Sequence, residues 1–344
     1  MSQDRRLAPI AHALNPGATP LTEPFPETPT AWAQAYALSW PGHPEQYVVR
    51  LIDAGAYERE AVAVEFAAAR LLGDQGIAPA VRHADPESGV LVMDRVQGHS
   101  VRPAGPAQAL SVAGLLARLH TLPWDSPVRL YARKRREAGE SVARLAGSRP
   151  ELALFGEALR AFDRLRAALA TLHTEHTLCH NDLNPGNMLF DGDRAWLIDF
   201  DHVGPGDPLF DVATAADALG LSPAGTDAFL ARYFGRPPTD DESARLELLG
   251  CLALLRYAVS ALSLVPEDLH PALAAWTPQD VGQAWVFQPD REQTPGHAVF
   301  RLALGFATAG LARLSRTPAT RALRTLHLTP ARPTPAPVGA GHAR

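Results

Sequence analysis

Short alternating runs of apolar and polar residues characterise the first hundred positions. In AWAQAYALSW, residues 31–40, the apolar side chains of Tyr36, Leu38 and Trp40 recur with a period of two, which predicts a strand. The turn sequence PGHPEQ separates this strand from YVVRLI, residues 47–52. We therefore expect the two segments to form an antiparallel pair.

A helix and two further strands complete this part of the pattern. YEREAVAVEFAAARLLGDQG, residues 57–76, is rich in Ala and Leu, begins with acidic residues and ends at glycines, which predicts a helix. PAVRHADPESGVLVMDRV, residues 79–96, predicts two strands around an Asp-Pro turn. Residues 1 to about 30 are rich in Pro, Thr and Ala, and we expect them to be irregular.

Beyond Gly98 the apolar positions follow a helical period. AQALSVAGLLARLHTL, residues 107–122, and the longer run at 153–176 predict amphipathic helices, and the pattern is helical again over 211–324. The exception is a pair of short apolar runs, NMLF and AWLIDF, joined by DGDR. Asp-Gly is a strong hairpin-turn signal, so these runs predict two paired strands.

Together these patterns predict an α+β protein with two lobes, for which 344 residues are sufficient. Residues 1–97 are expected to form an N-lobe, a small antiparallel sheet with one helix, and residues 98–328 a mainly helical C-lobe. Residues 329–344 are rich in Pro, Ala and Gly and predict a disordered tail. A crevice between two lobes is the natural place for a ligand.

Composition narrows the functional classes. With 46% hydrophobic and 20% charged residues the chain is globular, and its net charge of −5 argues against a nucleic-acid partner. The two cysteines, Cys179 and Cys251, cannot form a disulfide framework and fit no zinc spacing. Lys134 is the sole lysine and is followed by Arg135, which excludes a Walker A nucleotide loop.

The longest apolar run, Leu248–Val265, is interrupted by Arg256. It therefore predicts a buried helix and no membrane span. The N-terminal residues lack the apolar segment of a signal peptide. We expect a cytoplasmic protein with no membrane partner, and nothing in the pattern predicts an oligomeric state.

The candidate chemistry lies in LCHNDLNPGNMLF, residues 178–190. His180, Asp182 and Asn187 have the spacing H-x-D-x-x-x-x-N, which protein kinases use in their catalytic loop. The hairpin turn then brings Asp199 beside Asn187, and hard oxygen ligands of this kind suit Mg²⁺ bound to phosphate. Any one of these residues alone is better explained by turn capping. Their joint spacing favours phosphoryl transfer, which depends mainly on positioning and charge neutralisation.

The segment CHNDLNPGNMLF…AWLIDFDHVGPGDPLFDVA resembles the signature of the aminoglycoside phosphotransferase and choline kinase family, which has a two-lobed protein-kinase-like fold. GVLVMDRVQG, residues 89–98, resembles its last N-lobe strand and hinge, and LLARLHTLP, residues 115–123, the helix that opens its C-lobe. FLARYFGRPPTDDESARLELL, residues 229–249, resembles the choline and ethanolamine kinase-like members. The resemblance covers roughly residues 33–265.

The resemblance implies roles for individual residues. Asp182 would be the catalytic base, and Asn187 and Asp199 would hold Mg²⁺. His180 would support the loop without carrying a proton. The two further supporting positions are Asp201, which would touch a metal or the substrate or else be a plain surface carboxylate, and Asp211, the family's structural aspartate, which would steady the loop.

Protein kinases and aminoglycoside phosphotransferases grip the α- and β-phosphates of ATP with a strand lysine paired to a helix glutamate, but the first 97 residues here contain no lysine. Arg50 lies on the matching strand, where choline kinase-like members also have an arginine, and its planar fork can bind phosphate. The expected partner is Glu65, with Glu60 as the alternative. The resemblance further implies that adenine contacts the carbonyl of Asp94 and the amide of Val96.

One segment departs from the family pattern. FPETPTAWAQ, residues 25–34, should cover the phosphates but contains no glycine. Backbone amides and the hydroxyls of Thr28 or Thr30 could replace it. The alternative is a pseudo-kinase that binds ligands without turnover, against which the intact Asp182, Asn187 and Asp199 argue.

The acceptor must present a hydroxyl to Asp182. Choline would need an aromatic cage, for which Tyr257, Trp276 and Trp285 are candidates, although each is more often a core aromatic. An aminoglycoside would need an acidic pocket, and TDDESARLE is better explained as a helix N-terminus. Choline, ethanolamine, thiamine, aminoglycosides, sugars and amino-alcohols stay open. We expect an ATP- and Mg²⁺-dependent small-molecule kinase, choline or ethanolamine kinase-like first, with an aminoglycoside phosphotransferase or a non-catalytic pseudo-kinase as alternatives.

Overall fold

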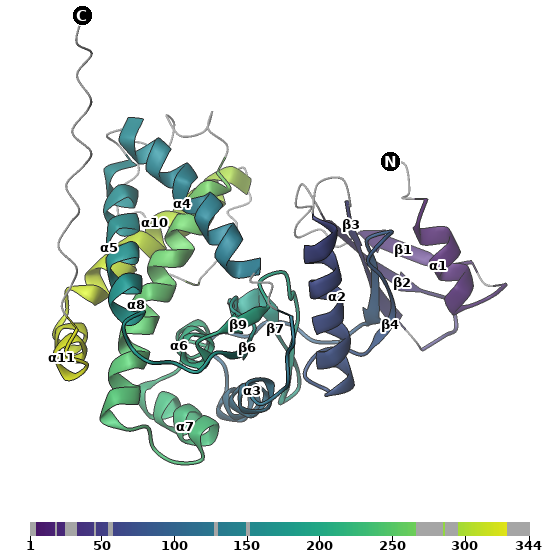
Figure 1. Cartoon of the computed structure of the whole chain (residues 1–344). Helices are drawn as coiled ribbons and strands as arrows, with labels where there is room; N and C mark the ends of the chain where they lie inside the picture. Colours follow the sequence, from purple (N-terminus) through teal and green to yellow (C-terminus); the bar gives the residue numbers. More distant parts are fainter. Residues whose placement is uncertain are drawn as a thin grey trace, which may run out of the picture. The chain divides into compact units, whose positions relative to one another are not determined.

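The computed structural model divides into two compact units, each built from two stretches of the chain (Figure 1). Unit 1 comprises Met1–Tyr131 and His176–Pro237, and unit 2 comprises Ala132–Glu175 and Pro238–Arg344. The predicted lobe boundary after residue 97 stays a prediction, and the predicted tail at 329–344 lies outside the described residues. The structure describes residues 5–17, 19–24, 33–44, 46–53, 58–126, 130–148, 152–265, 285 and 295–328.

Unit 1 contains a five-stranded antiparallel sheet in the order β1-β2-β3-β5-β4. The register sets Arg50 opposite Ala35 on one neighbouring strand and opposite Leu91 on the other, so these three side chains share a face of the sheet. All four predicted strands are confirmed, as β2, β3, β4 and β5. The strands are β1 (Leu21–Pro24), β2 (Ala33–Ser39), β3 (Gln46–Ile52), β4 (Val81–Asp85) and β5 (Val90–Asp94).

An N-terminal helix, α1 (Leu7–Leu14), covers the other face of the sheet. Leu7 and Ala11 pack in one buried cluster with Leu38 and Trp40. Figure 1 draws α1 and the helix α2 on opposite sides of the sheet. Both faces of the sheet are therefore covered, and the face opposite Arg50 is closed by the start of the chain.

The helix α1 and the strand β1 correct the expectation that residues 1 to about 30 are irregular. An isolated helix of eight residues is unstable in water, so packing against the sheet must hold it. Arg6 adds two anchors, because its Nη1 donates to the carbonyl of Ile52 at 2.8 Å and to that of Ser88 at 2.9 Å. The apolar stripe of Leu7 and Ala11 has a partner only once the sheet exists.

The helix α2 (Arg59–Asp74) lies over the Arg50 face and confirms the helix predicted at 57–76. Val62, Phe66 and Ala69 are buried at helical spacing, as an amphipathic helix on a sheet requires. Glu65 lies on the same buried side with only 2% of its surface exposed. A carboxylate so deeply buried needs a charged partner.

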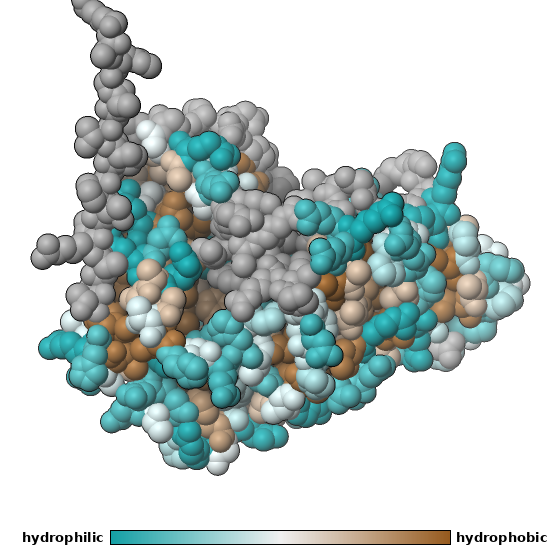
Figure 2. All heavy atoms as spheres, in the orientation of Figure 1, coloured by the Kyte–Doolittle hydropathy of each residue, from teal (hydrophilic) through white to brown (hydrophobic). Residues whose placement is uncertain are grey.

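The rest of unit 1 contains the predicted hairpin, which is confirmed as β7 and β8. The helix predicted at 107–122 is confirmed as α3, and α7 buries Phe229 while its visible surface is mainly hydrophilic (Figure 2). These elements are α3 (Pro106–Leu119), β6 (Thr177–Cys179), β7 (Met188–Asp191), β8 (Arg194–Leu197), β9 (Gly204–Gly206), α6 (Pro208–Ala218) and α7 (Pro223–Phe234).

Backbone hydrogen bonds anchor the β7–β8 hairpin on two sides. The Phe190 amide donates to the His99 carbonyl at 3.0 Å, and the His99 amide donates back at 3.2 Å. The Leu197 amide donates to the carbonyl of Ile77, just after α2, at 3.0 Å. A Cβ on Gly98 would lie 2.6 Å from the Phe190 carbonyl oxygen, so only glycine permits this approach. The hairpin is thus joined to the segments that follow β5 and α2.

Unit 2 is helical in its described part, with α8 packed against α5, α10 and α11. A capping box between Thr239 and Glu242 starts α8. The helix predicted around Leu248–Val265 is confirmed as part of α8, and 78% of its most apolar window is buried within the protein, although its length and composition alone would suit a membrane span. The helices are α4 (Leu130–Ser148), α5 (Ala153–Leu169), α8 (Asp240–Ser263), α10 (Pro295–Leu314) and α11 (Thr317–Thr325).

Candidate active site

The loop between β6 and β7 carries the predicted motif. The Asn184 side chain shapes its second half, because its Oδ1 accepts from the Gly186 amide at 2.8 Å. The Asn184 amide donates to the Asp182 carbonyl at 2.9 Å, and a short 3-10 turn, η2 (Pro185–Asn187), follows. Turn capping therefore does occur in this loop, at Asn184, and it folds the chain so that Asn187 returns to Asp182.

Two side-chain amides orient the Asp182 carboxylate. Nδ2 of Asn184 and Nδ2 of Asn187 each donate to Asp182 Oδ2 at 3.2 Å. Asn187 Nδ2 also donates to the Asp182 backbone carbonyl at 2.7 Å. The carboxylate is held in one orientation, which a positioned proton acceptor requires.

The same contacts define which way the Asn187 amide faces. Because its nitrogen is bound to Asp182, its oxygen is turned away from Asp182. The backbone amide of Ile198 donates to the backbone carbonyl of Asn187 at 3.1 Å. Asp199, the next residue after Ile198, therefore lies close to Asn187. An amide oxygen and a carboxylate are ligands that Mg²⁺ prefers, and Asn187 and Asp199 therefore fit a magnesium site.

Asp199 joins the hairpin to the sheet. Its backbone has φ +64°, the left-handed region, which costs a non-glycine residue about 1 kcal/mol or more. Its Oδ1 accepts from Arg50 Nη1 at 2.9 Å, and Arg50 Nε lies 3.2 Å from Glu65 Oε1. The expected pairing of Arg50 with Glu65 is present, and Arg50 bridges two carboxylates, one on α2 and one in the segment that follows β8.

The environment of Arg50 favours its charged form. Burial alone would lower its pKa, but attraction to Asp199, Glu65 and Asp201 outweighs burial and raises the pKa above its ordinary value. The guanidinium is therefore charged at every physiological pH. A permanent cation at this position suits the binding of phosphate.

Asp201 and His202 lie on the Asp182 side of the site. One ligand atom from each of Asp182, Asp201 and His202 lies within 4.8 Å of the other two, and all three residues are half-buried. His202 Nδ1 is 4.0 Å from Asp182 Oδ1. Asp201 thus faces the site, and its role there stays a prediction. His202 follows IDFD directly, and no motif or spacing in the sequence singled it out.

Asp211, on α6, holds the backbone of the loop. Its Oδ2 accepts from the His180 amide at 2.7 Å and its Oδ1 from the Asn181 amide at 2.8 Å, and Asp211 is fully buried. Asn181 has φ +63°, so these bonds stabilise a strained backbone directly before Asp182. This geometry agrees with the steadying role that the resemblance implies for Asp211.

His180 is also fully buried. Its Nε2 lies 2.9 Å from the Ile198 carbonyl, and since a carbonyl can only accept, Nε2 donates. The imidazole therefore ties the start of the loop to the strand end that carries Asp199. This is the contact of a supporting residue.

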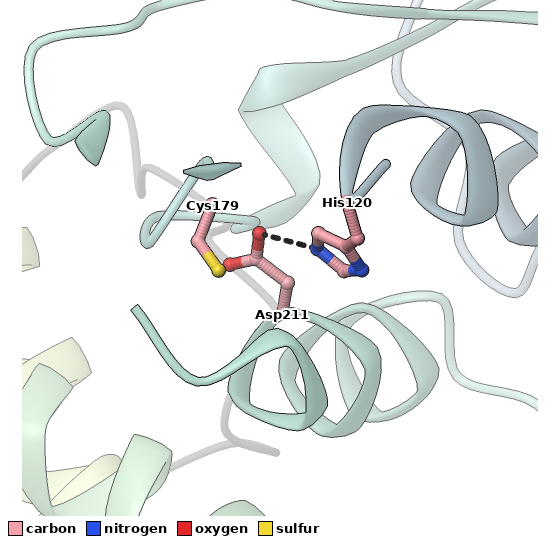
Figure 3. A group of neighbouring side chains, drawn as sticks. All are labelled: His120, Cys179 and Asp211. Carbon is pink, nitrogen blue, oxygen red and sulfur yellow. Dashed lines mark hydrogen bonds and ion pairs between the residues drawn. The ribbon is translucent and has the colours of Figure 1, made fainter. Parts of the chain in front are cut away.

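A compact cluster of His120, Cys179 and Asp211 lies beneath the loop (Figure 3). His120 Nε2 is 3.3 Å from Asp211 Oδ2. Burial and then the Asp211 charge raise the pKa of the Cys179 thiol well above its ordinary value, so the thiol stays protonated, whereas a metal needs the thiolate. Both Asp211 oxygens already accept amides. The hydrogen bond between His120 and Asp211 therefore supports the loop. No sequence pattern singled out His120, although it lies within LLARLHTLP.

The two residues predicted to contact adenine lie at the end of β5 and just after it. Asp94 is the last residue of β5, and Val96 lies in the segment after it. The Asp94 carboxylate is bound by Arg82 through two bonds of 2.7 Å, from Nε and from Nη2. The side chain of Asp94 is thus occupied, and the predicted contacts concern only its backbone.

The aromatic residues considered for an acceptor cage are in unit 2. Ring centroids of Tyr257, Trp285 and Phe306 lie 4.7 to 5.3 Å apart, and the Arg256 guanidinium is 4.8 Å from the Tyr257 centroid. Trp285 is 7% exposed. Rings packed against one another and against a cation form a core cluster and not an open cation cage. Trp276, Thr28 and Thr30 lie outside the described residues.

A family model described as "Phosphotransferase enzyme family" matches residues 31–248. Protein LicA of Haemophilus influenzae is 47% identical over 55 residues, which is 16% of this chain and 21% of that protein. A second LicA sequence from Haemophilus influenzae matches with the same identity over 16% of its length. The matched segment therefore spans about a fifth or less of these relatives.

Two solved structures share the fold. A choline/ethanolamine kinase family protein from Mesorhizobium loti has a TM-score of 0.66 at 19% identity, over 90% of this chain and 94% of that chain. Choline kinase LicA from Streptococcus pneumoniae has a TM-score of 0.63 at 17% identity, over 90% and 98%. The predicted kinase-like α+β fold class is confirmed.

Proposed function

The chain belongs to the phosphotransferase enzyme family, and from this membership we propose that it moves the γ-phosphoryl group of ATP to a hydroxyl group of a small molecule with the help of Mg²⁺. One observation carries the proposal. Arg50 on the sheet, Glu65 on α2 and Asp199 after the hairpin form one chain of charges, in the same unit as the oriented carboxylate of Asp182. A purely structural role requires no such convergence.

In this mechanism Asp182 accepts the proton of the attacking hydroxyl. Two amides fix its Oδ2, and a fixed acceptor lowers the cost of bringing the hydroxyl into line. After the transfer, the proton from the acceptor hydroxyl resides on the Asp182 carboxylate. Asn184 and Asn187 therefore both orient the Asp182 carboxylate.

Asn187 Oδ1 and the Asp199 carboxylate would hold Mg²⁺. When bound, the ion would neutralise charge on the phosphate oxygens during transfer. Arg50 would bind phosphate oxygens through its fork, and Glu65 would keep the guanidinium in place. The carbonyl of Asp94 and the amide of Val96 would bind the adenine edge.

For the acceptor we favour a choline- or ethanolamine-like amino-alcohol. Support comes from the two structurally similar proteins, a choline/ethanolamine kinase family protein and a choline kinase. Arg50 adds to it, because choline kinase-like members have an arginine at this position. The cluster around Tyr257 and Trp285 gives no support for a cation cage. Aminoglycosides, thiamine and sugars are the competing acceptors, and a pseudo-kinase is the competing class.

The proposal is tested by ADP release from the purified protein with ATP, Mg²⁺ and a panel of choline, ethanolamine, thiamine, aminoglycosides and sugars. We expect acceptor-dependent ADP release with an amino-alcohol. Release with an aminoglycoside alone would replace the favoured acceptor. ATP-induced thermal stabilisation without release on any acceptor would favour the pseudo-kinase, and absence of both would remove ATP from the proposal.

A further inference from the structure

We propose that Tyr233 and His120 form a hydrogen-bond relay that positions the catalytic loop through Asp211. His120 Nδ1 lies 2.8 Å from the Tyr233 hydroxyl, and His120 Nε2 lies 3.3 Å from Asp211 Oδ2. The relay ends at the two loop amides that Asp211 accepts. Its kinetic consequence rests on the proposed phosphotransferase activity, whereas its hydrogen-bond geometry does not.

Packing fixes the two new members against each other. His120 caps the C-terminal end of α3, and Tyr233 is the penultimate residue of α7, a helix that packs against α3. The two rings meet edge to face, with centroids 5.6 Å apart and an interplanar angle of 77°. His120 is 7% exposed, so its ring nitrogens depend on protein partners.

The chemistry of the partners sets the direction of the bonds. A carboxylate offers only acceptors, so His120 Nε2 carries the hydrogen and donates to Asp211. In the neutral imidazole Nδ1 is then bare, and it accepts from the Tyr233 O–H. Tyr233 therefore selects the tautomer. In the other tautomer a lone pair on Nε2 would face the Asp211 carboxylate, and Asp211 would lose His120 as a hydrogen-bond donor.

The orientation of Asp211 matters because of what its two oxygens hold. They bind the amides of His180 and Asn181, and Asn181 is kept at φ +63° directly before Asp182. If the carboxylate rotates, the strained peptide can relax, and Asp182 moves with it. A displacement of about 1 Å in a catalytic group costs on the order of a hundredfold in rate.

The first test is the tautomer itself. We would label histidine with ¹⁵N, identify the His120 resonances by their loss in H120Q, and compare wild type with Y233F. The expected result is a single Nε2–H form in wild type and a mixture of tautomers in Y233F. The control is Y36F, because the Tyr36 hydroxyl donates to Oε1 of the exposed Gln34 at 2.6 Å and Tyr36 lies on the sheet face opposite Arg50. An unchanged His120 spectrum in Y233F, or both ring nitrogens protonated in wild type, would overturn the relay.

The second test is kinetic. Y233F should lower kcat by roughly tenfold and leave KM for ATP unchanged, since the variant misplaces the base and not the nucleotide. H120A should lose more, and H120Q should regain part of the loss, because the glutamine amide can still donate to Asp211. In the H120A background Y233F should have no further effect. The relay would be wrong if Y233F lowered kcat by the same factor in wild type and in H120A. It would also be wrong if Y233F lowered the melting temperature and left kcat unchanged, because His120 and Tyr233 would then contribute only packing.

The relay and the proposed function fail separately. If wild type transfers phosphate and Y233F equals it, the relay is wrong and the function stands. If wild type releases no ADP with any acceptor, the function is wrong, and the relay is then decided by the tautomer spectrum and by hydrogen exchange of the Asn181 amide. Faster exchange in Y233F than in Y36F supports the relay, and equal exchange rejects it.

Discussion

Arg50 and Asp199 are 149 residues apart in the chain, and their side chains form an ion pair of 2.9 Å. The two groups proposed to receive phosphate and metal thus neutralise each other directly, and Glu65 adds a second carboxylate at 3.2 Å. Binding of Mg²⁺ and ATP would exchange this pair for one contact to the metal and one to phosphate. The pair thus couples the sheet to the hairpin.

Replacing Arg50 with alanine should lower stability. Glu65 is only 2% exposed and would be left without its cation. Loss of one partner from a buried ion pair costs about 3 to 5 kcal/mol. We expect a loss of about 3 kcal/mol in the free energy of unfolding, because Asp199, the other partner of Arg50, is 34% exposed. Urea unfolding measures this. R59A is the matched control, since Arg59 pairs with Glu87 on the surface and should cost less than about 0.5 kcal/mol. Equal losses in the two variants would contradict the role of Arg50.

Replacing Asp182 with asparagine should remove turnover while keeping nucleotide binding. The change is isosteric but removes the proton acceptor, and general base catalysis contributes about 10²- to 10⁴-fold. ADP release should fall by that factor, and the rise in melting temperature with ATP and Mg²⁺ should persist. Activity equal to wild type would remove Asp182 as the base. Loss of the thermal shift as well would indicate a wider disturbance of the loop.

Replacing Asp199 with asparagine should weaken the response to Mg²⁺. One carboxylate ligand is lost, so the Mg²⁺ concentration needed for half of the ATP-induced thermal shift should rise by about tenfold or more. D193N is the control, because Asp193 has the same charge and lies exposed in the turn of the same hairpin. A similar rise in both variants would reflect net charge and argue against a ligand at position 199.

The N-terminal helix should contribute to folding. Leu7 is 4% exposed in the cluster with Leu38 and Trp40, and L7A should cost about 2 to 4 kcal/mol. L21A is the matched control, because Leu21 on β1 is 54% exposed and should cost little. The midpoints of urea unfolding compare them. If L7A unfolds like L21A, α1 is not part of the cooperative core.

Much of the local structure followed from the sequence. The period of two at Tyr36, Leu38 and Trp40, the helix over α2 and the Asp-Gly hairpin depend on neighbouring residues and turn chemistry, and each was found where predicted. The spacing of His180, Asp182 and Asn187 is also local, and the loop does bring Asn187 back to Asp182. Short-range patterns carry such features because backbone geometry relates residues a few positions apart.

What the sequence by itself determined is therefore β2 to β5, the helices α2 and α3, the β7–β8 hairpin and the order of the chemical groups along the chain. Only the tertiary structure decided that α1 closes the sheet, that His120 donates to Asp211, and that Arg50 reaches Asp199. Each of these contacts joins segments far apart in sequence. Their energy comes from burying apolar surface and pairing buried polar groups, which exist as partners only after the chain has folded.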